Sequence, residues 1–113
     1  MLNQGERRKA VRFSVRLKVY DQGSSKLIGY CEDISLNGIR LMSETPLPTN
    51  MEVNVSLDRN DNGTGISLTL YRVWQAVSET VPRYYYTGLH IVSPDDQTLD
   101  SIQDLIHDLF VSQ

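Results

Sequence analysis

Alternation between apolar and polar side chains is the feature that most restricts how this chain can fold. From Phe13 to Tyr20, apolar residues at the odd positions are separated by polar or charged residues at most even positions. Because successive side chains of a β-strand point to opposite faces, this pattern predicts a strand with one buried face. Five further segments are predicted to be strands, and they cover residues 27–34, 39–42, 51–57, 66–77 and 83–92.

Segments rich in turn-forming residues separate these predicted strands. Residues 21–25 form one such cluster, and residues 58–65 are rich in Asp, Asn and Gly. Asn37 and Gly38 predict a tight turn, because both residue types tolerate a positive φ angle. Six strands joined by short turns predict a mainly β fold, which is either a small antiparallel barrel or a sandwich.

The last part of the chain changes to a helical period. Ser93 and Pro94 match the N-cap and N1 positions of a helix, and acidic residues follow in the first turn. Apolar residues then recur as one stripe at Leu99, Ile102, Leu105, Ile106, Leu109 and Phe110. This pattern predicts an amphipathic helix over about residues 94–111 that packs against the β-structure.

Length, cysteine content and hydrophobicity limit the class of protein. A chain of 113 residues is long enough for one domain with its own core. The single cysteine, Cys31, cannot form an internal disulfide, so nothing indicates an oxidising compartment. No apolar run approaches the roughly 18 residues of a membrane span, and residues 1–6 lack the apolar segment of a signal peptide. We therefore expect a cytoplasmic protein without a membrane span.

The net charge of −3 is unevenly distributed. Residues 1–20 hold six Lys or Arg and one Glu, whereas residues 94–113 hold five Asp and no Lys or Arg. The basic N-terminal segment indicates an anionic partner, such as a phosphate group, a nucleic acid or a membrane surface. Because the chain as a whole is acidic, we do not expect broad binding to DNA.

Two short motifs carry the chemical signal, and the first is a pair of arginines just before the first predicted strand. Arg8 and Arg12 stand at RxxxR spacing, and Arg7 adjoins them. Guanidinium groups bind phosphate oxygens bidentately and stack on nucleic-acid bases. Arginine pairs are also common on protein surfaces, so this motif alone does not define a site.

The second motif is a DxSxxG sequence formed by Asp33, Ser35 and Gly38. On a rigid turn, Asp and Ser side chains can hydrogen-bond to a base edge or a ribose hydroxyl, and Gly lets a ligand approach the backbone. The same sequence is also compatible with an ordinary turn.

Taken together, in this order and within this β-rich pattern, the two motifs resemble those of the PilZ domain family. The resemblance extends over nearly the whole chain and implies a six-stranded antiparallel PilZ-type β-barrel with a C-terminal helix over residues 13–113. Residues 1–12 would be a flexible basic arm that carries the arginines. The family binds the bacterial second messenger cyclic di-GMP. The positions of this sequence that match the binding motifs are Arg8, Arg12, Asp33, Ser35 and Gly38.

The residue before the arginine pair bears on the number of ligands. In PilZ domains that resemble this one, a basic residue at the position of Arg7 accompanies the binding of two stacked cyclic di-GMP molecules. A second anionic ligand beside the first requires a further cation, which Arg7 can supply. The resemblance therefore implies two ligand molecules per chain.

The implied function is that of a receptor or adaptor that changes conformation on ligand binding and signals to a downstream partner protein. No local catalytic signature, phosphate-binding loop or metal-ligand spacing suggests an enzyme, a cofactor or a metal site. Residues 58–63 match the first half of a calcium-binding loop, but Thr69 stands at its final acidic position, so we predict a hairpin loop. Two alternatives are a PilZ-like protein-interaction scaffold that binds no nucleotide and a small barrel that binds single-stranded RNA.

The role of the single tryptophan stays open on the sequence alone. Trp74 lies in the fifth predicted strand, where it is either an aromatic wall beside the guanine or part of the barrel core. Stacking on a base would stabilise binding by about 1–3 kcal/mol. Residues 84–86 are three consecutive tyrosines, for which ordinary strand alternation competes with a role as a stacking platform.

Overall fold

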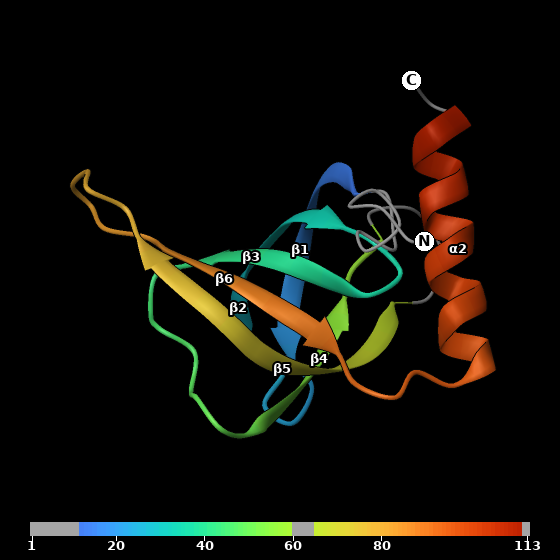
Figure 1. The fold of residues 1–113 in the computed structure, drawn as a ribbon, viewed down its shortest axis with the longest axis horizontal. Coiled ribbons are helices and arrows are strands. Elements are labelled where there is room, and N and C mark those ends of the chain that lie inside the picture. Colours follow the sequence, from blue (N-terminus) through green and yellow to red (C-terminus); the bar gives the residue numbers. More distant parts are fainter. Residues whose placement is uncertain (1–11, 60–64, 112–113) are drawn as a thin grey trace, which may run out of the picture.

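The computed structural model describes residues 12–59 and 65–111. Within these residues, six strands precede one helix (Figure 1). Their bounds are β1 Phe13–Asp21, β2 Leu27–Ile34, β3 Gly38–Ser43, β4 Glu52–Leu57, β5 Ile66–Val77, β6 Tyr85–Ile91 and α2 Asp96–Val111. Each predicted strand corresponds to an observed one, and the bounds of β2 and β5 coincide with the predicted ranges.

The strands form a closed barrel in the order β1-β2-β3-β6-β5-β4, and every neighbouring pair is antiparallel. The pairing of β1 with β4 closes the barrel, so none of the six strands has a free edge. This confirms the predicted antiparallel barrel and excludes the sandwich. Residues 58–65 join two antiparallel partners, as the hairpin interpretation requires, because Leu57 pairs with Ile66.

The inward faces of the strands form one apolar core. In β1, Leu17 and Val19 point inward and are buried, whereas Phe13 and Val15 nearer the barrel end are only partly buried. Burial of such side chains stabilises the fold by about 25 cal/mol per Å² of apolar surface. The other strands supply Cys31, Ile34, Ile39, Leu41, Val55, Leu57, Ile66, Leu68, Leu70, Leu89 and Ile91.

The helix α2 packs at one end of the barrel, and the hairpin that joins β5 to β6 projects on the opposite side (Figure 1). Ile102 and Leu105 from the predicted stripe are buried in the core. Phe110 departs from the prediction: it is 66% exposed because the last turn of α2 extends beyond the barrel. The Arg59 side chain ties α2 to the segment after β4 through an ion pair of 2.8 Å with Asp108.

The start of α2 also differs from the prediction. The cap is Asp95 rather than Ser93: its Oδ1 accepts a hydrogen bond of 2.7 Å from the Thr98 backbone N–H. This bond to the charged carboxylate lowers the pKa of Asp95. Ser93 instead has a φ angle of 40° and belongs to the turn before the helix.

Candidate ligand-binding site

A β-bulge in β5 determines the side of the barrel on which Trp74 lies. Leu68 and Leu70 follow the alternation and are buried. Opposite β6, Arg72 pairs with Leu89 and Trp74 pairs with Gly88, so Val73 is an extra residue in β5. The extra residue reverses the alternation. Trp74 therefore points outward and is 46% exposed, which shows that the barrel-core interpretation of this residue is wrong.

The indole of Trp74 lies directly over Gly88. A Cβ atom at Gly88 would stand less than 3.0 Å from the indole atoms Nε1, Cε2 and Cδ1. Any larger residue at this position would displace the ring. Behind the ring, the inward-facing residue is Gln75, whose Oε1 accepts hydrogen bonds from Leu47 N–H at 3.3 Å and Thr87 Oγ1 at 3.2 Å.

The two sequence motifs meet in an ion pair between neighbouring strands. Arg12 immediately precedes β1, and Asp33 lies near the end of β2, where the adjacent Ile34 pairs with Phe13. The Arg12 Nε donates a hydrogen bond of 2.9 Å to Asp33 Oδ1, and Nη2 contacts the same oxygen. Both side chains retain access to solvent. This arrangement places a cation and an anion next to each other at the surface.

Ser35 lies beneath the surface and organises the turn between β2 and β3. Its side chain is buried, and its Oγ accepts hydrogen bonds from the backbone N–H groups of Asn37 at 3.2 Å and Gly38 at 3.3 Å. The Ser35 backbone N–H donates to the Gly38 carbonyl at 2.9 Å. Ser35 therefore shapes the turn that follows Asp33, and its hydroxyl is engaged within that turn.

Gly38 is required by a close approach of two strands rather than by its φ angle. The predicted tight turn between β2 and β3 is present, but it forms without a positive φ at Asn37 or Gly38, because among the described residues only Ser25, Asn50 and Ser93 have a positive φ. A Cβ atom at Gly38 would instead lie less than 3.0 Å from the Leu89 carbonyl oxygen of β6. Gly38 pairs with His90 at this point.

A pocket of about 510 Å³ brings most of the described motif residues together. Arg12, Asp33, Gly38 and Trp74 line it, and Gly88 forms part of its floor. Ser35 does not line it. Arg7 and Arg8 lie outside the described residues. The pocket thus combines a cation, an anion, an aromatic face and two positions without side chains.

Sequence reasoning missed Arg40 and His90, which also line this pocket. Arg40 follows Gly38 by two residues, so strand alternation places both on one face of β3. That spacing was a usable signal for Arg40. His90 could be found only from the register, because it depends on the pairing of β3 with β6.

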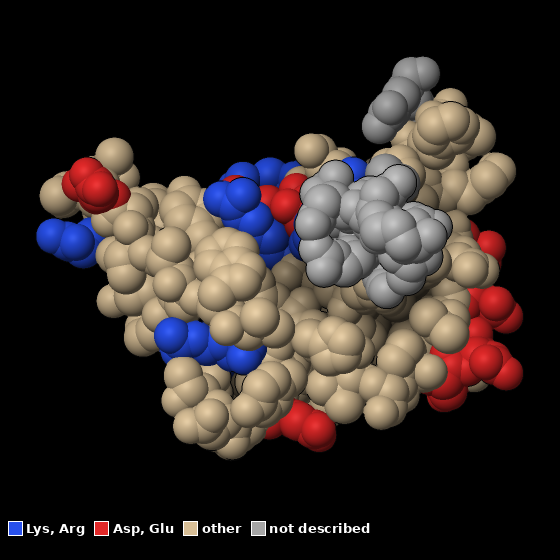
Figure 2. Space-filling view, in the orientation of Figure 1, with Lys and Arg blue, Asp and Glu red and all other residues tan. Residues whose placement is uncertain are grey.

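Basic and acidic side chains lie next to one another on this part of the surface, and acidic side chains gather along α2 (Figure 2).

The single cysteine lies beneath this surface. The thiol of Cys31 is buried in the barrel and donates a hydrogen bond of 3.2 Å to the Asp33 backbone carbonyl. Burial, reinforced by the nearby negative charge of Asp33, raises the pKa of Cys31 to about 12. The thiol therefore stays protonated and is not a nucleophile.

The described part of the chain contains neither a metal-binding cluster nor a membrane-spanning helix. No group of three or more His, Cys, Asp or Glu side chains in residues 12–59 and 65–111 is arranged to hold a metal ion. The helix in these residues is neither long enough nor apolar enough to cross a membrane.

Comparison with known structures identifies the same fold elsewhere. The PilZ domain with c-di-GMP of YcgR from Escherichia coli superposes with a TM-score of 0.75 at 12% identity, covering 94% of this chain and 93% of that one. The Bacillus subtilis inhibitor of motility, MotI/DgrA, gives a TM-score of 0.72 at 14% identity, over all of this chain and 58% of its own. At these identities the likeness establishes the fold.

A structure of the Borreliella burgdorferi PlzA protein in complex with c-di-GMP also matches, with a TM-score of 0.52 at 10% identity, over 96% of this chain and 55% of that one. No curated protein matched the sequence. The family model of the PilZ domain matches residues 6–108, which include both motifs, all six strands and most of α2. The chain therefore belongs to the PilZ domain family.

Proposed function

We propose that this protein is a receptor for cyclic di-GMP. The observation that carries the proposal is the convergence of Arg12, Asp33 and Trp74 on one pocket. Membership of the PilZ family supports it, as do the structures of E. coli YcgR and B. burgdorferi PlzA, which contain c-di-GMP.

Each of these three side chains has a distinct task in the proposal. The Arg12 guanidinium binds a phosphate through charge-assisted hydrogen bonds. Trp74 offers its exposed ring face to a guanine, since its opposite face rests on Gly88. The Asp33 carboxylate accepts hydrogen bonds from base N–H groups. In the structure, the Arg12 guanidinium and the Asp33 carboxylate form an ion pair with each other.

The remaining motif residues act in two ways. Ser35 holds the turn through its hydrogen bonds to the backbone of Asn37 and Gly38. Arg8 and Arg7 would add positive charge from the segment before Arg12.

We include in the proposal that two ligand molecules bind per chain, with Arg7 neutralising the charge of the second molecule. Titration at protein concentrations well above the dissociation constant would give this ratio, and Arg7→Leu should reduce it from two to one.

Output from such a receptor would require a change that another protein can detect. We propose that ligand binding orders the segment around Arg12, and that the altered surface contacts a partner protein. Arg12 stands at the start of β1, and α2 packs against β1. A pull-down with and without cyclic di-GMP would test this step.

Isothermal titration calorimetry with cyclic di-GMP tests the central proposal. Arg12→Ala should weaken binding more than tenfold, because a charge-assisted hydrogen bond contributes about 1.5–3 kcal/mol. Lys18→Ala is a matched control, since Lys18 is an exposed cation on β1 that does not line the pocket. If the wild-type protein released no binding heat and showed no shift of its unfolding midpoint, the scaffold without nucleotide binding would be the better account.

The single-stranded RNA alternative makes a different prediction for the same titration. A strong preference for single-stranded oligonucleotides over cyclic di-GMP would favour that alternative.

A further inference from the structure

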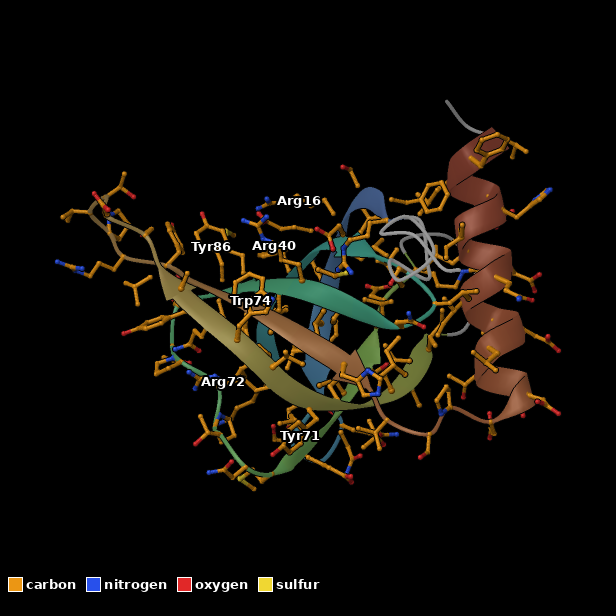
Figure 3. All side chains as sticks on the ribbon, in the orientation of Figure 1. Arg16, Arg40, Tyr71, Arg72, Trp74 and Tyr86 are labelled. Atoms are coloured by element: carbon orange, nitrogen blue, oxygen red, sulfur yellow. The ribbon has the colours of Figure 1, made fainter. Side chains whose placement is uncertain are left out.

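The pocket contains a second arginine that belongs to neither sequence motif. Arg40 of β3, Gly88 of β6 and Trp74 of β5 form one row across three neighbouring strands. Adjacent strands are about 4.8 Å apart. Because Gly88 has no side chain and carries the indole of Trp74, Arg40 is the next side chain beside that ring (Figure 3).

Two contacts hold the Arg40 side chain in place, and neither of them is a hydrogen bond. Its guanidinium lies over the ring of Tyr86, 5.0 Å from the ring centre, and its Nε lies 3.9 Å from Glu32 Oε1. That Nε is buried and has no hydrogen-bond partner among the described residues, while the side chain as a whole is 43% exposed. The two contacts orient the guanidinium and leave its outer edge facing the pocket.

Arg12 differs from Arg40 in this respect. Two of its nitrogens already contact the Asp33 carboxylate. A ligand phosphate that binds Arg12 therefore competes with that carboxylate for the guanidinium. Arg40 stands at the edge of the aromatic surface rather than beside the carboxylate. The geometry therefore points to different ligand groups for the two arginines.

We propose that Arg40 recognises the guanine that stacks on Trp74, and thereby selects guanine over adenine. A purine stacked on the indole lies above Gly88 with one edge toward β3 and Arg40. Guanine presents two acceptors on its Hoogsteen edge, O6 and N7, which match a guanidinium fork, whereas adenine presents an amino donor in place of O6. The inference rests on the proposed function, and it adds a residue that reads the Hoogsteen edge of the base.

The test compares Arg40→Met with Arg16→Met. Both substitutions remove one cation and one contact with a tyrosine ring, but Arg16 lines a different pocket. Cyclic di-GMP and cyclic di-AMP would each compete with a fluorescent cyclic di-GMP derivative. We expect Arg40→Met to weaken cyclic di-GMP binding about tenfold or more and to leave the affinity for cyclic di-AMP unchanged. The preference for cyclic di-GMP over cyclic di-AMP would then fall by the same factor. Arg16→Met should leave the preference at its wild-type value.

Cyclic di-IMP isolates the edge that Arg40 reads, because hypoxanthine keeps O6 and N7 but lacks the 2-amino group. Arg40→Met should weaken its binding by the same factor as for cyclic di-GMP. Thermal unfolding verifies that the variants fold. If Arg40→Met does not fold, Arg40→Lys takes its place, because lysine keeps the charge but lacks the guanidinium fork. An unchanged preference between guanine and adenine dinucleotides in a folded Arg40 variant overturns this inference alone. Failure of the wild-type protein to bind cyclic di-GMP overturns the proposed function as well.

Discussion

Inside the barrel, Leu68 and Leu70 follow the alternation of β5 without interruption, whereas on the pocket face Trp74 owes its position to the extra residue Val73. The interior depends on apolar volume and on which side of the strand a residue occupies. The pocket depends on a bulge, on two close approaches at glycines and on one ion pair. Stability and binding are thus assigned to different residues of the same strands. Substitutions should therefore separate the two properties.

The largest expected effect tests the interior. Leu41 of β3 is 1% exposed, so Leu41→Ala should lower the free energy of unfolding by about 2–5 kcal/mol through lost burial and the cavity that remains. The folded variant should bind cyclic di-GMP like the wild type. Denaturant unfolding and titration below the transition measure the two quantities. Val77→Ala, at a 44% exposed position of β5, is the control and should change stability by less than about 0.5 kcal/mol. A large loss of affinity in folded Leu41→Ala would show that interior and pocket are not separable.

The next effect tests the pocket face. Gly88→Ala introduces a Cβ where the indole of Trp74 lies, so the ring must move. We expect a loss of about 1–3 kcal/mol of binding free energy, the contribution of stacking on one base. Intrinsic fluorescence of the single tryptophan reports the displacement directly. Gly23→Ala is the matched control, because a Cβ there would meet only the Asp21 carboxylate at an ordinary distance of 3.5 Å.

A double variant shows whether the effect runs through the ring. If Gly88→Ala acts by displacing Trp74, it should have little further effect on affinity in a Trp74→Ala background. Additive losses in Gly88→Ala/Trp74→Ala would mean that Gly88 acts in another way, for example through direct approach of the ligand to its backbone.

The same contrast explains what the sequence could predict. Alternation specified the six strands, because a side chain on the wrong face would expose apolar surface to water. The resemblance of the two motifs to those of the PilZ family indicated Arg12, Asp33 and Gly38 as members of one site, and the structure places them around one pocket. Arg7 and Arg8 lie outside the described residues and stay predictions.

Other features depend on pairing between strands that are distant in sequence. The outward side of Trp74 requires the bulge opposite Gly88, and the place of Arg40 beside it requires the register of β3 on β6. Neither is visible in a single strand. The prediction of Ser93 as the helix cap was wrong, because Ser and Asp are both good caps and the local sequence does not decide between them. The structure selects Asp95.

A smaller effect concerns the turn that joins the two regions. Ser35→Ala removes the acceptor for the backbone N–H groups of Asn37 and Gly38, so it should lower the free energy of unfolding by about 0.5–1.5 kcal/mol. If Ser35 only shapes the turn, affinity should fall modestly. Ser14→Ala, at an exposed position of β1, should leave both quantities unchanged. A loss of affinity as large as that of Arg12→Ala would instead indicate direct contact of Ser35 with the ligand.

The smallest effect concerns the helix cap, which should influence stability alone. The Asp95 carboxylate accepts a hydrogen bond from Thr98 N–H, which lowers its pKa in the folded protein. A lowered pKa means that the stabilisation is present above the unfolded pKa of about 3.9 and is lost as the pH falls through the folded pKa. Asp95→Asn keeps the cap but cannot titrate, so the difference in unfolding midpoint should move in favour of the variant only as the pH falls below about 4. Cyclic di-GMP affinity at neutral pH should be the same for both proteins, because Asp95 does not line the pocket. A midpoint difference that does not change with pH would show that the carboxylate charge at this cap contributes nothing to the fold.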